Sequence, residues 1–144
     1  MMCERQVDIE GLISSAFRGA LHDMRENGHR HYWFAGGRGS GKSTFVSLVI
    51  ASGLNADKNA NAVIYRRTAN TLWDSVYKQM AWALDTLIPE SGWVFRKTPM
   101  EIFNRRTGQR ILFRGADDPM KSKGIRPGRG YFRYVWKVIT RSTR

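Results

Sequence analysis

The sequence is poor in cysteine and lacks any long apolar run. Cys3 is the single cysteine among 144 residues, which excludes an internal disulfide and fits a reducing compartment. No stretch approaches the roughly 18 apolar residues that a membrane-spanning helix requires. The first residues, Met1 to Arg5, lack the apolar segment and the small-residue cleavage site of a signal peptide. We therefore expect a cytoplasmic protein that does not enter a membrane.

Acidic residues are scarce in the C-terminal third of the chain. Residues 1–95 carry ten basic and nine acidic side chains, whereas residues 96–144 carry fourteen basic and three acidic ones. The net charge of +12 is thus concentrated after residue 95. A one-sided basic segment, most of it arginine, is typical of proteins that contact nucleic-acid phosphates. A solvated basic surface without such a partner is the alternative interpretation.

Hydrophobic periodicity predicts alternating helices and strands in one domain. Apolar residues spaced near the 3.6 period predict helices over residues 7–27, 44–52 and 71–88. Short apolar runs predict strands at 32–35, 62–65, 93–95, 102–103, 111–113 and 131–136, with a hairpin turn at Thr107-Gly108. This order predicts an α/β sandwich with a mainly parallel sheet, in which the hairpin is an insertion or an edge.

A glycine-rich segment has the phosphate-binding pattern G-x-x-x-x-G-K-[ST]. It follows one predicted strand and opens one predicted helix, which is the context that a P-loop requires. Glycines allow the backbone N–H groups to converge on phosphate oxygens, and the following helix adds its partial positive charge. The sequence therefore predicts a P-loop NTPase fold whose nucleotide-binding residues are Gly36, Gly37, Arg38, Gly39, Ser40, Gly41, Lys42, Ser43 and Thr44.

The residue types in this loop imply ATP and Mg²⁺ as ligands. Lys42 is expected to contact the β- and γ-phosphates, and the Ser43 hydroxyl to bind the magnesium ion. Arg38 is a candidate arginine finger that stabilises transition-state charge, so Arg38 and Lys42 are the candidate catalytic residues. A solvent-facing role for Arg38 is equally compatible with the sequence.

A carboxylate for the magnesium ion is missing where an ATPase normally has one. The last acidic residue is Asp118, and the final predicted strand is followed by Lys137. Asp117 and Asp118 follow the strand at 111–113 only after three intervening residues, which predicts a loop position. We therefore expect nucleotide binding with impaired hydrolysis. His22, His29 and His31 lack metal-ligand spacing and are expected at the surface or at helix ends.

Three segments resemble the large subunit of phage terminases, in the group named after the PBSX prophage. The first is the arginine-containing loop at 36–43, and the second is Tyr65-Arg66-Arg67-Thr68-Ala69-Asn70-Thr71-Leu72-Trp73-Asp74-Ser75-Val76-Tyr77. The third is Gly108-Gln109-Arg110-Ile111-Leu112-Phe113-Arg114-Gly115-Ala116-Asp117-Asp118-Pro119-Met120-Lys121, which a general P-loop would not require. The resemblance covers residues 28–136.

The resemblance implies a motor ATPase that packages double-stranded DNA into procapsids in a bacterial host. It implies double-stranded DNA, a terminase small subunit and a portal protein as partners, and leaves a homo-oligomer open. It also implies a C-terminal nuclease domain, which we expect this protein to lack, and paired acids after the strand ending in Trp136, where residues 137–144 diverge. We therefore expect a truncated form, a partial P-loop ATPase domain over residues 1–144 whose sheet is incomplete at the C-terminus.

Two other classes of function remain open from the sequence. A small P-loop nucleotide or metabolite kinase would suit the length, with the Lys- and Arg-rich segment after Gly115 as a lid. An inactive DNA-binding remnant would suit the missing acid. Phosphoryl transfer to a small acceptor would favour the kinase, and the absence of ATP turnover would favour the remnant.

Overall fold

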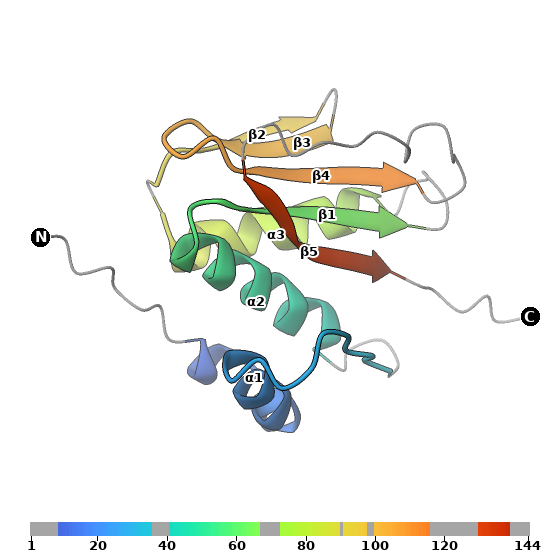
Figure 1. Cartoon of the computed structure of the whole chain (residues 1–144). Coiled ribbons are helices and arrows are strands. Elements are labelled where there is room, and N and C mark those ends of the chain that lie inside the picture. The colour runs from blue at the N-terminus through green and yellow to red at the C-terminus, as the bar shows by residue number, and fades with distance from the viewer. Residues whose placement is uncertain are drawn as a thin grey trace, which may run out of the picture.

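The computed structural model describes residues 9–35, 41–66, 73–89, 91–97, 100–115 and 130–138. Figure 1 shows a sheet of five strands with two long helices along one side and a short helix beyond them. No helix in these ranges is both long and apolar enough to cross a membrane.

The sheet has the strand order β2-β3-β4-β1-β5. Its central strand, β1 (Ala60–Arg66), pairs in parallel with β4 (Arg110–Gly115) on one side and with β5 (Tyr131–Val138) on the other. The strands β2 (Trp93–Lys97) and β3 (Met100–Asn104) form an antiparallel hairpin, and β3 is also antiparallel to β4. The α/β prediction is therefore confirmed, but the sheet is mixed rather than mainly parallel.

The predicted turn at Thr107-Gly108 is confirmed, and it joins β3 to β4. Gly108 has a positive φ of 78°, a conformation that favours glycine. The Asn104 side-chain oxygen accepts hydrogen bonds from the backbone N–H groups of Arg106 and Thr107, which fixes the turn. The β2–β3 hairpin lies at one edge of the sheet with β2 outermost, and β5 forms the other edge.

Two helices, α2 (Lys42–Ala56) and α3 (Trp73–Leu87), cover one face of the sheet. The ring of Tyr77 on α3 lies 5.5 Å from the ring of Phe113 on β4. A side chain at Gly53 on α2 would collide with Tyr134 on β5. Phe113 is in register with Ile64 of β1, and Tyr134 is in register with Ala62. Because Ala62 and Ile64 are two residues apart, Phe113 and Tyr134 lie on the same face of the sheet. The buried core therefore lies between this face and the two helices.

The helix α2 extends past Gly53, where the sequence predicts that it ends. The missing side chain of Gly53 leaves room for the Tyr134 ring, so this glycine brings the helix close to the edge strand. Packing against β5 thus overrides the weak helix propensity of glycine. The other predicted helix of this layer, over residues 71–88, is confirmed as α3, and Pro89 follows it.

The predicted helix over residues 7–27 is shorter than expected. The structure has 3-10 turns at Glu10–Leu12 and Ser15–Phe17, followed by α1 (Arg18–Arg25). Ile13, between the two turns, has extended backbone angles. The resulting bend lets Ile9 and Ile13 enter the core, where both side chains are buried. Asn27 takes a positive φ after the helix, as the predicted Asn27-Gly28 ending implies.

The predicted strand at Tyr32 to Ala35 is wrong, since these residues form no strand. The Phe34 ring instead lies 5.3 Å from the ring of Phe45 on α2 and 5.8 Å from that of Phe17. These ring contacts hold the segment beside the start of α2 and away from the sheet. The apolar pattern of this segment therefore reflects packing on helices and not backbone pairing.

Candidate functional site

The candidate site is the beginning of α2. Gly41 precedes this helix with φ 80° and ψ 8°, the left-handed conformation that favours glycine. The Gly41 carbonyl accepts a hydrogen bond from the Phe45 N–H at 2.9 Å, which closes the first helical turn. The last glycine of the predicted loop is therefore required by the backbone geometry at the point where the helix starts.

The first turn of α2 carries Lys42, Ser43 and Thr44. Ser43 is exposed, and Lys42 and Thr44 are half-buried. The first turn of a helix has N–H groups without an intrahelical acceptor and a partial positive charge. No acidic side chain lies in this turn to offset that charge. The turn thus combines a cationic side chain, two hydroxyl groups and a helix N-terminus, which together suit a phosphate ligand.

Buried contacts fix the position of this turn. The Phe45 ring stacks on that of Phe17 with a centroid distance of 4.8 Å, which connects α2 to the N-terminal region. The buried Ser47 hydroxyl donates to the Thr44 carbonyl at 2.9 Å. Gln79 on α3 donates in turn to the Ser47 hydroxyl at 3.4 Å. The beginning of α2 is therefore held by packing on one side and by polar contacts on the other.

A second polar cluster holds the chain segment that precedes the loop. Asp23 on α1 accepts a hydrogen bond from the Tyr32 hydroxyl at 2.6 Å, and His29 Nδ1 lies 2.7 Å from the same carboxylate oxygen. The Tyr32 hydrogen bond, followed by that of His29, lowers the pKa of Asp23, and the same bond raises the pKa of Tyr32. Sequence reasoning missed this cluster, because nothing in the spacing pairs an acid on the helix with a tyrosine nine residues later.

The site lies near the C-terminal ends of the parallel strands. The strands β1, β4 and β5 point in the same direction, and the beginning of α2 lies on the side of their C-terminal ends (Figure 1). Ligands of open α/β sheets bind at this edge. The strands end here at Arg66, Gly115 and Val138.

Only part of the predicted site falls within the described residues. Gly41, Lys42, Ser43 and Thr44 lie at the start of α2. The loop residues Gly36, Gly37, Arg38, Gly39 and Ser40 lie outside the described residues, as do Arg67, Asp117 and Asp118. The predicted roles of Arg38 and of the two aspartates therefore stay predictions.

The three histidines are exposed, as the sequence predicts. His22 is in the last turn of α1 with its side chain 3.4 Å from Glu26, and His29 and His31 are exposed on the following segment. Among the described residues no three His, Cys, Asp or Glu side chains are grouped as metal ligands would be. Trp82 is 42% exposed on α3, and the side chain of Trp73 lies outside the described part of the chain.

Comparison with known proteins identifies the family. A family model described as phage terminase large subunit matches residues 28–137, from the segment that follows α1 into β5. The chain belongs to the phage terminase large subunit family. It is 33% identical over 108 residues to the terminase large subunit of Bacillus phage SPP1, a match that covers 75% of this chain and 25% of that protein. No solved structure matches the chain.

The candidate site and the sheet, except the last residue of β5, lie inside the matched region, whereas α1 lies outside it. The terminase chain spans about a quarter of the length of the SPP1 relative. The activity and partners of a whole terminase large subunit are therefore matters for proposal here.

Proposed function

We propose that this terminase chain binds ATP with Mg²⁺ at the beginning of α2, as the nucleotide-binding part of a motor that packages double-stranded DNA. The observation that carries the proposal is the left-handed Gly41 followed by Lys42 and Ser43 in an acid-free first helical turn. This arrangement, at the C-terminal edge of a sheet, matches the chemistry that a nucleotide triphosphate needs.

The residues in this turn have distinct roles in the proposal. Lys42 neutralises charge on the β- and γ-phosphates, and the backbone N–H groups of the turn orient phosphate oxygens. The exposed Ser43 hydroxyl suits a magnesium ligand, since hard cations prefer oxygen donors. When bound, the ion would offset the negative charge of the phosphates. Arg38 would supply a further positive charge beside the γ-phosphate.

Hydrolysis is expected to be weak in this chain. An ATPase needs a carboxylate near the magnesium ion, usually at the end of a strand. The sequence has no acidic residue after Asp118, and β5 ends with Lys137 and Val138. The proposed partners, namely DNA, a small subunit, a portal protein and further copies of the chain, follow from the terminase family.

Calorimetric titration with ATP tests the proposal. We expect the parent chain to bind ATP in the presence of magnesium, and Lys42→Ala to bind at least about tenfold more weakly because a charge-assisted phosphate contact is lost. Lys58→Ala is the matched control, since Lys58 is exposed and follows the C-terminal end of α2.

Equal ATP affinity of the parent and Lys42→Ala would overturn the proposed site. No ATP binding by a folded parent chain would overturn the proposed function. Turnover above the Lys42→Ala background would show that an acid elsewhere in the chain serves hydrolysis.

A further inference from the structure

The antiparallel part of the sheet carries a concentration of exposed cations. Residues 93–115 include six basic side chains and one acidic side chain, Glu101. Glu101 is shielded, with only 13% of its side chain exposed, and it lies 3.7 Å from Arg96. The basic residues of this segment are Arg96, Lys97, Arg105, Arg106, Arg110 and Arg114, and all except Arg114 are exposed.

The strand register places several of these side chains on one face. Arg96 is opposite Glu101 in the β2–β3 pair, and Phe103 is opposite Arg110 in the β3–β4 pair. Glu101 and Phe103 are two residues apart on β3, so all four side chains lie on the same face. Glu101 is also in register with Leu112, which places this face opposite the one that α2 and α3 cover.

A hollow of about 310 Å³ lies on this face. It is lined by Arg96, Glu101, Phe103, Asn104, Gly108 and Arg110. The Arg96 guanidinium lies over the Phe103 ring, 5.1 Å from its centroid, so the aromatic face and the Glu101 carboxylate hold it in place. A positioned guanidinium at the rim of a hollow is well suited to bind a phosphate oxygen, since less rotamer freedom is lost on binding.

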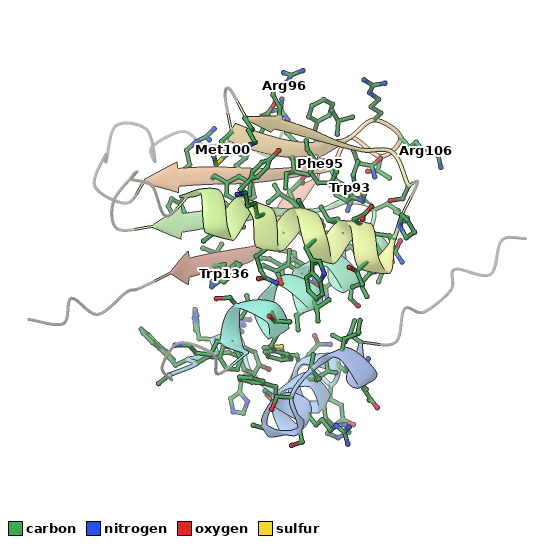
Figure 2. All side chains as sticks on the ribbon, turned by 180° about the vertical axis from the view of Figure 1, so that it is seen from behind. Trp93, Phe95, Arg96, Met100, Arg106 and Trp136 are labelled. Atoms are coloured by element: carbon green, nitrogen blue, oxygen red, sulfur yellow. The ribbon has the colours of Figure 1, made fainter. Side chains whose placement is uncertain are left out.

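Further cations lie outside the hollow, at Arg105 and Arg106 in the turn between β3 and β4. Figure 2 shows Arg96 and Arg106 at the margin of the molecule, near opposite ends of the β2–β3 hairpin. Arg96 and Arg110 lie on strands two apart in the sheet and are offset by two residues along the strand direction. These spacings put their Cα atoms about 12 Å apart. This separation is close to the width of about 12 Å of the DNA major groove. Their side chains can therefore reach phosphates on both strands of one duplex.

We propose that this face, formed by Arg96, Phe103 and Arg110 together with Arg105 and Arg106 of the β3–β4 turn, binds the phosphate backbone of double-stranded DNA. We call it the hairpin face. The choice of duplex DNA as the polyanion rests on the proposed packaging function. The location of the surface rests on charge, register and the hollow alone.

Salt-dependent binding to a 30-base-pair duplex, followed by fluorescence anisotropy, tests the hairpin face. Each phosphate contact contributes about 0.9 to the slope of log affinity against log salt concentration. We expect Arg96→Gln with Arg110→Gln to lower the slope by about 2 and the affinity by about tenfold. Arg18→Gln with Arg30→Gln removes the same charge from exposed positions at and after α1, and should leave the slope unchanged.

A second variant protects the test against misfolding. Arg105→Gln with Arg106→Gln leaves the Arg96–Glu101 pair intact and should also lower the slope by about 2.

The inference is overturned if the folded parent does not bind duplex DNA, if neither hairpin-face variant lowers the slope, or if the control lowers it equally. ATP calorimetry on the same variants separates the two proposals. If ATP binds normally but the hairpin-face variants have the same salt slope as the parent, only the hairpin-face proposal is contradicted. If the variants lower the salt slope but the parent does not bind ATP, only the nucleotide proposal is contradicted.

Discussion

At the scale of single residues, the side-chain amide of Gln109 contacts the end of α2, the start of β1 and the segment between them. The Gln109 side chain is 2% exposed, and its Nε2 lies 2.8–3.0 Å from three backbone carbonyl oxygens. These carbonyls belong to Leu54 and the segment from Asp57 to Ala60, at the junction between α2 and β1. Gln109 lies in the third of the three segments that resemble terminases, and the structure gives it a purely structural role.

Replacing Gln109 with alanine is expected to destabilise the chain by about 2–4 kcal/mol, because buried carbonyl groups lose their donor. The matched control is Gln79→Ala, since Gln79 is half-buried and donates one hydrogen bond, at 3.4 Å. We expect the control to cost about 1 kcal/mol or less. Urea denaturation measures both free energies of unfolding, and equal losses for the two variants would contradict this role of Gln109.

At the scale of elements, the edge strand β5 is attached to the α2–β1 junction by a carboxylate. Asp57 accepts hydrogen bonds from the Tyr131 hydroxyl and from Arg133 on β5. The hydrogen bond from Tyr131 is the main cause that lowers the pKa of Asp57, and the Asn59 N–H and Arg133 lower it further. The ionised form of Asp57 therefore stabilises the contact of β5 with the rest of the sheet.

The lowered pKa of Asp57 predicts a pH dependence with a definite sign. The stabilisation is fully present above the unfolded pKa of about 3.9, and it is lost as the pH falls through the lower folded value. We expect Asp57→Asn to be less stable than the parent at pH 6, with the difference shrinking as the pH falls below about 4. Tyr131→Phe should remove part of the same pH dependence. A stability difference that stays constant between pH 6 and pH 2 would be evidence against this attachment.

The elements also show what the sequence could and could not predict. Apolar runs predicted β1 and α3 well, because both bury a continuous apolar surface. The segment from Tyr32 to Ala35 has the same apolar character, but its Phe34 packs on Phe17 and Phe45. Hydrophobic periodicity indicates which residues are buried but not what they pack against. It therefore could not distinguish a strand from a segment packed on helices. The prediction that the helix ends at Gly53 was wrong for a related reason, since Gly53 contacts Tyr134, which is remote in sequence.

The structure shows only part of the candidate site that the sequence predicts. The left-handed Gly41 and the helix that starts at Lys42 are present, whereas the strand predicted before the loop does not form. The binding roles of these residues stay predictions. The hairpin face was visible in the sequence only as a charge imbalance after residue 95. Its grouping of Arg96, Phe103 and Arg110 depends on the register of three strands, which charge counting does not reveal.

At the scale of the whole molecule, the two surfaces that we propose bind anions lie on separate parts of the chain. The first turn of α2 lies at the C-terminal edge of the parallel strands, whereas the hairpin face lies on the antiparallel strands, opposite the helices. The strand β4 belongs to both parts, since it is parallel to β1 and antiparallel to β3. The proposed function requires nucleotide and DNA to be bound at once, and two separate surfaces joined by one strand would allow this.

The central claim is that nucleotide phosphates bind at the beginning of α2. Backbone amide NMR spectra recorded during an ATP titration with magnesium test it residue by residue. We predict that the largest shifts occur at Gly41, Lys42, Ser43 and Thr44, and that they disappear in Lys42→Ala. Shifts confined to the turn from Arg105 to Thr107, with the amides at the beginning of α2 unchanged, would show instead that ATP binds only as a general anion on the hairpin face, and would contradict the claim.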